Sequence, residues 1–260
     1  MRLRIARRGG VLGLAAVAAL LAGIAPAAAA PGAGSAYGVQ VNVTLLGASA
    51  VHVGPLAPAS TSGPATDSVA SATVPGILTA GVLDTSAAKD PDTGAVTASA
   101  STADVGLPVL SGLGTVKAKL IAAKCVATQA GESGTATLTD AQLGGLGALA
   151  VNPKPNTVIA IKLPGIGNVA SLTLNEQIQH QDGSLTVNAF HLHLLGGYGI
   201  GHLGSGDVII SSATCGPAGL PVPMASGAGL WIGLGLLGVI AVPVGATVLR
   251  RRRASLPTSV

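Results

Sequence analysis

The sequence predicts an all-β protein, with a single antiparallel β-sandwich-like ectodomain between an N-terminal signal peptide and one C-terminal transmembrane helix. Three observations lead to this prediction. Apolar and polar residues alternate along most of the middle of the chain, a period typical of half-buried strands. A long apolar segment lies at each end, the first behind arginines and the second ahead of them. The 260 residues are 48% apolar and only 9% charged, which is too apolar for an ordinary soluble domain.

The first 29 residues have the features of a secretory signal peptide. Arg2 to Arg8 supply a positive start, and Val11 to Ile24 supply an apolar segment that is short for a membrane span. Ala27 and Ala29 form an Ala-x-Ala site, so we expect cleavage after Ala29. An uncleaved anchor is the alternative.

Residues 30–216 form the predicted β-rich domain, which is long enough to bury a core of its own. The clearest strand is Val39–Leu45, where apolar and polar residues alternate without a break. The same reasoning places further strands at Val51–Val53, Val69–Val74, Ala95–Ala100, Val116–Thr128, Gly134–Thr139, Thr157–Leu163, Val169–Gln179, Ser184–Leu195 and Asp207–Cys215.

Turn residues separate these strands. Asp182-Gly183 lies between two strong strands and is the best hairpin signal in the chain. Pro55 to Ser68 is rich in Pro, Ser, Thr and Gly, and we expect a loop there. Asp140 to Ala150 allows a short helix, although three glycines within it weaken that prediction.

Cys125 and Cys215 are the only cysteines, and each lies near the end of a predicted strand. In an exported protein such a pair is most simply a disulfide. It would close a loop of about 90 residues, which the chain-entropy model values at roughly 4–5 kcal/mol as an upper figure. A reactive thiol pair is the alternative, but the Cys-x-x-Cys spacing typical of one is missing.

His191 and His193 are the candidate metal ligands. They are two residues apart on a predicted strand, so both side chains face the same way. His180, His202 or Asp207 could complete a site. The alternative is a pair of strand histidines that are solvated or hydrogen-bonded and bind no metal.

The apolar pattern around these histidines changes phase. Leu185, Val187 and Ala189 follow one phase, and Phe190 begins the other. Either a bulge at Ala189-Phe190 turns both histidines to solvent, or the histidines share a face with Leu185 and Val187.

Several classes of function are disfavoured. The net charge of +4 comes from arginines at the two ends, because the region between them has six lysines and all ten acidic residues, leaving no basic footprint for nucleic acid.

Gly199 to Gly204 matches Gly-x-Gly-x-x-Gly, but a strand follows it instead of the helix that a dinucleotide site needs. Tyr37, Tyr198 and Phe190 are the only aromatic residues of the domain, too few for binding by base or sugar stacking. No serine has a recognisable triad setting, and we expect no catalytic residue and no cofactor.

The C-terminal end has the features of a membrane anchor. Residues 217–226 form a short Pro/Gly stalk, residues 227–249 the transmembrane helix and residues 250–260 a basic cytoplasmic tail. The uncharged segment would span roughly 35 Å at ~1.5 Å per residue, enough for the hydrocarbon core. Trp231 suits the outer interface and Pro243 a kink, and transfer is expected to stop at the arginines Arg250, Arg251, Arg252 and Arg253. A buried core helix with a basic tail is the alternative.

Five segments of the chain carry a family resemblance. They are Ser35–Gly38, Leu174–Gln177, Gly183–Leu194, Gly206–Ile210 and Ala213–Gly216. Together they resemble the choice-of-anchor P family of actinobacterial surface proteins, over most of the predicted ectodomain. The resemblance implies an exported domain with an interchangeable C-terminal anchor, and it implies no activity or catalytic residue.

These observations together predict a single-pass protein of the cell membrane, with its ectodomain outside and its C-terminus in the cytoplasm. We expect a non-catalytic β domain with a structural or adhesive role at the cell envelope. Membrane lipid is the expected contact of the C-terminal helix, and an envelope or surface protein partner is left open. The alternative is a metal-binding module or a metal-dependent surface enzyme that uses His191 and His193.

Overall fold

The computed structural model describes residues 31–45, 48–163, 165, 167–195 and 203–220. The predicted signal peptide and transmembrane helix lie outside these residues, as do Trp231, Pro243 and the arginines from Arg250 to Arg253. Among the helices of the described residues, none combines the length and the apolar character that a membrane span requires.

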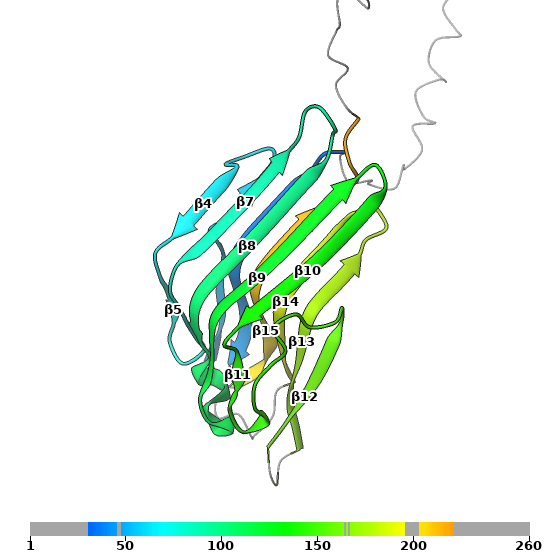
Figure 1. The fold of residues 1–260 in the computed structure, drawn as a ribbon. Helices are drawn as coiled ribbons and strands as arrows, with labels where there is room; N and C mark the ends of the chain where they lie inside the picture. Colours follow the sequence, from blue (N-terminus) through cyan, green and yellow to red (C-terminus); the bar gives the residue numbers. More distant parts are fainter. Residues whose placement is uncertain (1–30, 46–47, 164, 166, 196–202, 221–260) are drawn as a thin grey trace, which may run out of the picture.

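Two antiparallel sheets, called sheet A and sheet B here, face each other (Figure 1). Sheet A has the strand order β12 (Thr157–Leu163), β13 (Gly167–Gln179), β14 (Leu185–Leu195), β15 (Leu203–Cys215), β1 (Gly34–Leu45) and β2 (Ala48–Leu56), and β3 (Ala59–Ser60) pairs with β1. Sheet B has the order β10 (Gly131–Thr139), β9 (Val116–Thr128), β8 (Val96–Gly106), β6 (Leu78–Ala80) and β5 (Ala72–Val74). Alongside this path, β7 (Leu83–Lys89) pairs with β8 and with β4 (Thr66–Val69), and β11 (Gln142–Leu143) pairs with β9. This architecture confirms the prediction of an antiparallel, sandwich-like all-β fold.

Nine of the ten predicted strands are present, and most of these are longer than expected, whereas the predicted strand Val69–Val74 is divided between the end of β4 and β5. Asp182-Gly183 forms the predicted hairpin, since β13 and β14 pair on either side of it and Gly183 has the positive φ of 81° that such a turn favours. The sequence reasoning missed β3, β6, β7 and β11, of which all but β7 have only two or three residues.

Two other predictions were wrong. The expected loop at Pro55 to Ser68 contains the end of β2, all of β3 and the start of β4. These pieces have only two or three residues each within the segment, which is too few for an apolar alternation to show. The expected helix at Asp140 to Ala150 is instead β11 followed by the 3₁₀ turn η2 (Gly144–Leu146). Gly144 and Gly147 have φ values of 50° and 90°, which an α-helix does not allow.

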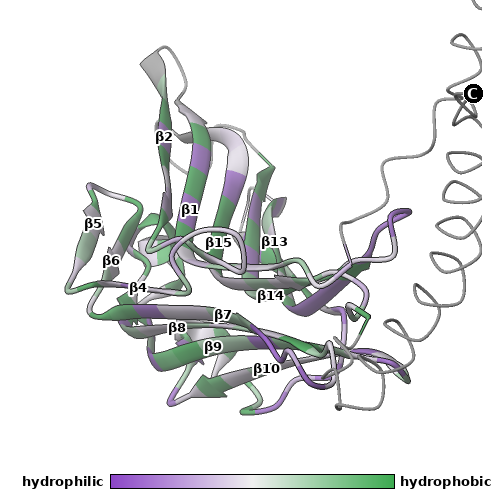
Figure 2. Cartoon of the chain, turned by 90° about the horizontal axis from the view of Figure 1, so that it is seen from above, coloured by the Kyte–Doolittle hydropathy of each residue, from purple (hydrophilic) through white to green (hydrophobic). Residues whose placement is uncertain are grey.

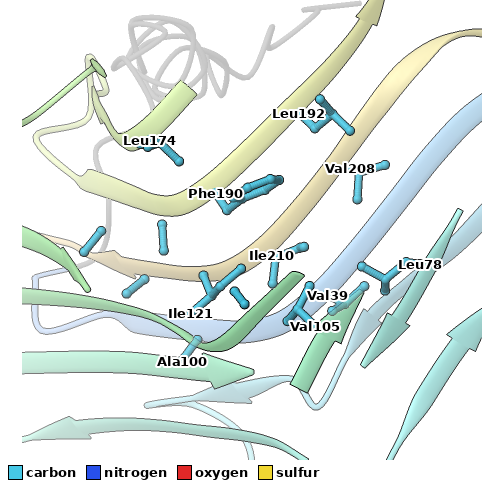
Figure 3. Packing of buried hydrophobic residues seen from close by; sticks show 14 of the residues in the cluster. Val39, Leu78, Ala100, Val105, Ile121, Leu174, Phe190, Leu192, Val208 and Ile210 are labelled. Atoms are coloured by element: carbon cyan, nitrogen blue, oxygen red, sulfur yellow. The ribbon is translucent and has the colours of Figure 1, made fainter. Parts of the chain in front are cut away.

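The core lies between the sheets and consists mainly of small aliphatic side chains (Figure 3). Figure 2 shows that apolar and polar residues alternate along the strands, so each sheet buries one face. Among the described residues, Phe190 is the only aromatic residue of the core, and it is 2% exposed. Glycines bring the sheets close together. A Cβ added to Gly134 would lie 2.4 Å from Val187 Cγ2, and one added to Gly38 would lie 2.6 Å from Leu83 Cδ2.

A row of residues interrupts the ladders of four neighbouring strands of sheet A. Asn175, Ala189, Ser211 and Gly38 lie one on each of β13, β14, β15 and β1, and the pairing skips each of them while the register on either side is kept. We call these four residues the skipped row. Asn175 and Ser211 have φ values of 50° and 57°.

The skipped row changes which side chains face the core. On β14, Ala189 and Phe190 are adjacent in sequence and both buried, and the buried positions then continue at Leu192 and Leu194. The strands curve near Phe190 and Ile210 (Figure 3). This agrees with the first of the two alternatives above, in which a bulge at Ala189-Phe190 turns both histidines outward.

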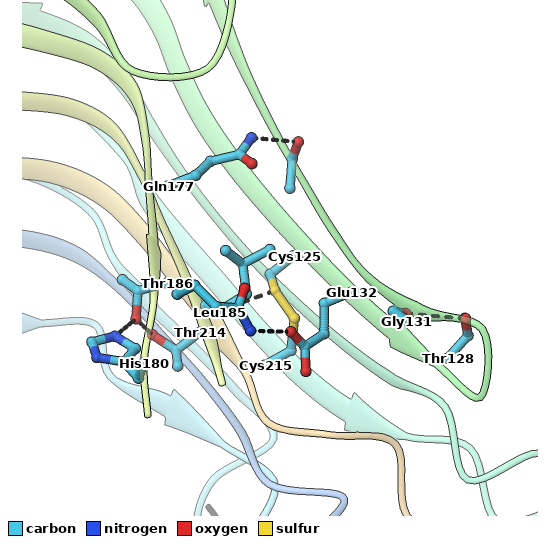
Figure 4. Close-up of a disulfide and its surroundings, with 12 residues drawn as sticks. Cys125, Thr128, Gly131, Glu132, Gln177, His180, Leu185, Thr186, Thr214 and Cys215 are labelled. Carbon is cyan, nitrogen blue, oxygen red and sulfur yellow. Dashed lines mark hydrogen bonds between the residues drawn. A yellow bond between two sulfur atoms is a disulfide. The ribbon is translucent and has the colours of Figure 1, made fainter. Parts of the chain in front are cut away.

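The predicted disulfide is confirmed. Cys125 of β9 and Cys215 of β15 are bonded, their Cα atoms are 5.8 Å apart and both are fully buried (Figure 4). The bond therefore joins sheet B to sheet A.

Both ends of the described domain lie beside this disulfide. Gly32 N–H donates to Pro217 O and Gly216 N–H donates to Ala33 O, each at 2.8 Å. We call this end the near pole and the opposite end the far pole; the far pole includes the 3₁₀ turns η1 (Pro108–Leu113) and η2 (Figure 1).

Candidate functional site

A polar cluster lies on the outer face of sheet A, on the central strands β13, β14 and β15. We call it the His191 cluster; its members are Glu176, Asn188, His191, His193 and Asp207. His191 Nδ1 donates to Glu176 Oε2 at 2.8 Å, and His191 Nε2 donates to Asp207 Oδ1 at 3.0 Å. His193 Nδ1 donates to the same Asp207 oxygen at 2.7 Å. His191 is thus held between two carboxylates on neighbouring strands.

The strand register explains this arrangement. Asp207 on β15 lies opposite His193 on β14, and Glu176 on β13 lies opposite Asn188. The skipped row adds one residue between Asn188 and His191, so both side chains face outward although they are three positions apart. Glu176 can therefore contact both of them.

The carboxylates favour the charged form of His191. The hydrogen bond to Glu176 raises the pKa of His191, burial works against this, and the hydrogen bond to Asp207 adds to the rise. Because both ring nitrogens face carboxylate oxygens, both must donate, which only the imidazolium form can do. The side chains of His191 and Glu176 are only 20% and 19% exposed, so solvent screens their contact less than it would an open surface pair.

The pKa values of the two carboxyl groups shift in the opposite direction. The hydrogen bond from His191 is the largest cause that lowers the pKa of Glu176 below its usual value. Burial works to raise the pKa of Asp207, but the hydrogen bonds from His193 and His191 outweigh it and the pKa is lowered. The cluster is therefore a network of charge-assisted hydrogen bonds at mildly acidic pH.

The network continues across the sheet to β1. Asn188 Nδ2 donates to Glu176 Oε2 at 2.7 Å, and Ser212 Oγ donates to Asn188 Oδ1 at 2.7 Å. Tyr37 lies beside Ser212, and burial raises the pKa of its phenol. Polar side chains on four neighbouring strands are thus connected, and among the described residues no buried side-chain nitrogen or oxygen lacks a hydrogen-bond partner.

Of the two further expected ligands that the structure describes, Asp207 lies beside His191 and His193 and His180 does not. His180 lies near the other end of the sheet, where its Nε2 contacts Thr186 Oγ1 at 2.9 Å (Figure 4), and His202 is outside the described residues. Within the part of the chain that the structure describes, no group of three or more His, Cys, Asp or Glu side chains is arranged to hold a metal ion. A metal would have to displace a proton from His191, since both of its nitrogens donate to carboxylates.

Sequence reasoning missed Glu176 as a partner of His191. Glu176 is fifteen positions away in the sequence. The signal was nevertheless present, because a hairpin centred on Asp182-Gly183 pairs Glu176 with Asn188.

An apolar groove at the open edge of the sandwich was also missed. It has a volume of about 440 Å³ and lies between β12 and the segment that holds β11 and η2. Leu143 and Leu174 are fully buried at its base, and Leu146 at its rim is 53% exposed. Its lining consists of Leu143, Leu146, Ala148, Leu149, Ala150, Asn152, Pro153, Lys154, Thr157, Ile159 and Leu174, so none of the domain's aromatic residues that the structure describes takes part.

Comparisons with known proteins add no further constraint. No family model, no curated protein and no solved structure matches the chain.

Proposed function

We propose that the chain is a single-pass membrane-anchored protein whose β domain is held outside the cell, where it has a structural or adhesive role at the envelope. The C-terminal anchor is the segment 227–249 identified from the sequence. The resemblance to the choice-of-anchor P family belongs to the same proposal.

One observation carries this proposal: both ends of the domain leave from the near pole. Gly32 bonds to Pro217 and Gly216 bonds to Ala33, and Gly219 N–H also donates to Gly94 O at 2.8 Å. A chain that continues into a membrane anchor from this pole would leave the far pole and both outer sheet faces accessible. This geometry suits the display of a domain above a surface.

The disulfide and the His191 cluster support the same proposal. Disulfides persist in oxidising compartments outside the cytosol, and Cys125–Cys215 is buried between the sheets. In the cluster, each nitrogen of His191 donates to a carboxylate, so neither is available as a general base. This arrangement favours a structural role for the cluster.

A protease test on intact bacterial cells addresses the anchoring. We expect external protease to digest the domain of the full chain while a tag placed after residue 260 stays protected. A variant that ends at Ser226 is the matched control, and we expect it in the culture medium. Full-length protein in the cytosol with its leader attached and its thiols reduced would contradict the proposal.

Metal binding at His191 and His193 is the second candidate function. The observation that favours it is the convergence of both imidazoles on the carboxylate of Asp207. Metal analysis of the purified protein after zinc loading separates the two candidates. Stoichiometric zinc that is lost in His191→Ala and in His193→Ala would support the metal site and contradict a structural, metal-free role for the cluster. If the purified protein binds no zinc, the metal site is excluded.

A further inference from the structure

We propose that the domain resists mechanical tension applied between its far pole and its C-terminal tether, along a covalent path formed by β9, the Cys125–Cys215 disulfide and the chain after Cys215. This inference rests on the proposed membrane anchoring for its use in the cell. The path itself is a property of the domain.

Tension on the tether enters the fold at Cys215. β15 ends at this residue, and the chain then runs along the near pole to Leu220, the last described residue of that segment. Between Cys215 and Leu220, the described part of this segment, few hydrogen bonds hold the chain to the domain; examples are Gly219 N–H to Gly94 O and Gln129 Nε2–H to Gly219 O. These bonds are individually weak, so a pull transfers to Cys215.

The disulfide passes the load from Cys215 to β9. Cys125 lies toward the near-pole end of β9, which begins at Val116 beside η1 at the far pole. β9 is an inner strand of sheet B, paired with β8 on one edge and with β10 on the other (Figure 1). The covalent path therefore runs along the length of sheet B.

This path has little slack. A strand already extends ~3.3 Å per residue, close to the maximum of about 3.6 Å for a polypeptide. The segment from Ser111 on η1 to Cys125 has roughly 14 residues, so it can reach no more than about 50 Å when fully stretched. The hydrogen bonds of an antiparallel ladder are perpendicular to the strands, so a pull along β9 loads them together.

The N-terminal part of the chain lacks this protection. β1 precedes Cys125 and lies outside the loop that the disulfide closes. Its first residue, Gly34, pairs with Cys215 at the near pole, so a pull on the N-terminal end separates β1 from β15 one pair at a time. The predicted resistance thus depends on the direction of the pull.

Single-molecule force spectroscopy on the oxidised full-length protein in detergent tests the proposal. One handle is attached after residue 260. The other is attached by a thiol reaction to Ser111→Cys, an exposed position at the far pole. The native cysteines are buried in their disulfide and do not compete for this handle. We expect no extension step within the domain longer than about 50 Å.

Two control experiments use the same measurement. With Cys125→Ala and Cys215→Ala, the same handles should give a step of about 350 Å, because roughly 100 residues are released, at half the force or less. With the handle moved to Ser35→Cys, the oxidised protein should give about 300 Å, from the roughly 90 residues before Cys125. If the double variant does not fold, as judged by circular dichroism, adding reductant to the oxidised protein under load replaces it, and the long step should appear only after reduction.

Two results would overturn the load path. One is a long step in the oxidised protein pulled at Ser111→Cys. The other is a protein without the disulfide that bears the same force as the oxidised one. Neither depends on where the protein lies in the cell, so failure of the anchoring proposal and failure of the load path are distinguishable.

Discussion

Replacing Gly38 by alanine tests how closely the two sheets approach each other. Gly38 lies on β1, and an added Cβ would lie 2.6 Å from Leu83 Cδ2 and 2.9 Å from the Cβ and Cγ atoms of the same leucine. Leu83 is fully buried on β7, so its side chain has no open space into which to move. The new methyl group must therefore displace part of the core.

The expected loss combines two opposing effects. Overpacking of a core costs about 1–3 kcal/mol. Gly38 is not among the residues with positive φ, so alanine also restricts the unfolded chain, which stabilises by about 0.4–1 kcal/mol. We expect Gly38→Ala to lower the free energy of unfolding by roughly 1–2 kcal/mol.

Urea unfolding of the oxidised protein, followed by circular dichroism, measures this loss. The midpoint should fall while the m-value stays unchanged. Gly145→Ala is the matched control, because its added Cβ would meet only Leu113 O at 3.6 Å, and it should change stability by no more than about 0.5 kcal/mol. In a Leu83→Ala background the penalty of Gly38→Ala should disappear. If Gly38→Ala is as stable as the wild type, or costs the same in both backgrounds, the contact does not limit the sheet spacing.

Three further predictions concern the disulfide, the core and the His191 cluster. Changing both Cys125 and Cys215 to alanine should lower the free energy of unfolding by up to about 4–5 kcal/mol, because the bond closes a loop with a sequence separation of 90. Urea titration should give the same free energy of unfolding for the double variant and for the reduced wild type. Phe190→Ala should cost about 3–5 kcal/mol in the same titration, since Phe190 is the one aromatic ring in the core, and a loss below about 1 kcal/mol would mean that the site collapses around the cavity. In the cluster, the pKa of His191 is raised, so its contribution to stability is fully present below pH 6.5 and is lost as the pH rises through the pKa of the folded state. The pKa of Glu176 is lowered, so its contribution to stability is present above pH 4.5 and is lost as the pH falls through the pKa of the folded state. The urea midpoint of the wild type should therefore be highest between these pH values. In His191→Gln the midpoint should decline less as the pH rises above this range. A wild-type midpoint that increases from pH 6.5 to 8 would contradict the charge assignment.

The sequence predicts the long strands well because each alternates apolar and polar residues over many positions. β9 has the predicted bounds of Val116–Thr128, and β12 has the predicted bounds of Thr157–Leu163. The short edge strands escape this reasoning. β3 and β4 have two and four residues, and among the described strands each pairs with one neighbour, so their conformation depends on β1 and β7 rather than on their own pattern.

The segment after Asp140 misleads for a different reason. Leu143, Leu146 and Leu149 are spaced by three residues, which fits the period of a helix face. In the structure this spacing lines the apolar groove instead, because Gly144 and Gly147 have positive φ and break the helix. Backbone freedom at two glycines outweighs the side-chain period.

The candidate site is predicted only in part. The outward direction of His191 and His193 was one of two open alternatives, and the phase change at Ala189-Phe190 contained the information that distinguishes them. The partnership with Glu176 depends on strand pairing, which a single strand's pattern does not specify.

The skipped row has a consequence for how this fold can vary. Removing Ser211 alone would shift the far-pole half of β15 by one position, and Asp207 would then face the interior while Val208 faced water. If one residue were also removed from a single neighbouring strand, the remaining strands of the skipped row would still be out of register with these two. A residue can therefore be gained or lost at this level only if β13, β14, β15 and β1 change together, so insertions and deletions that other proteins tolerate singly are expected here as a concerted set or not at all.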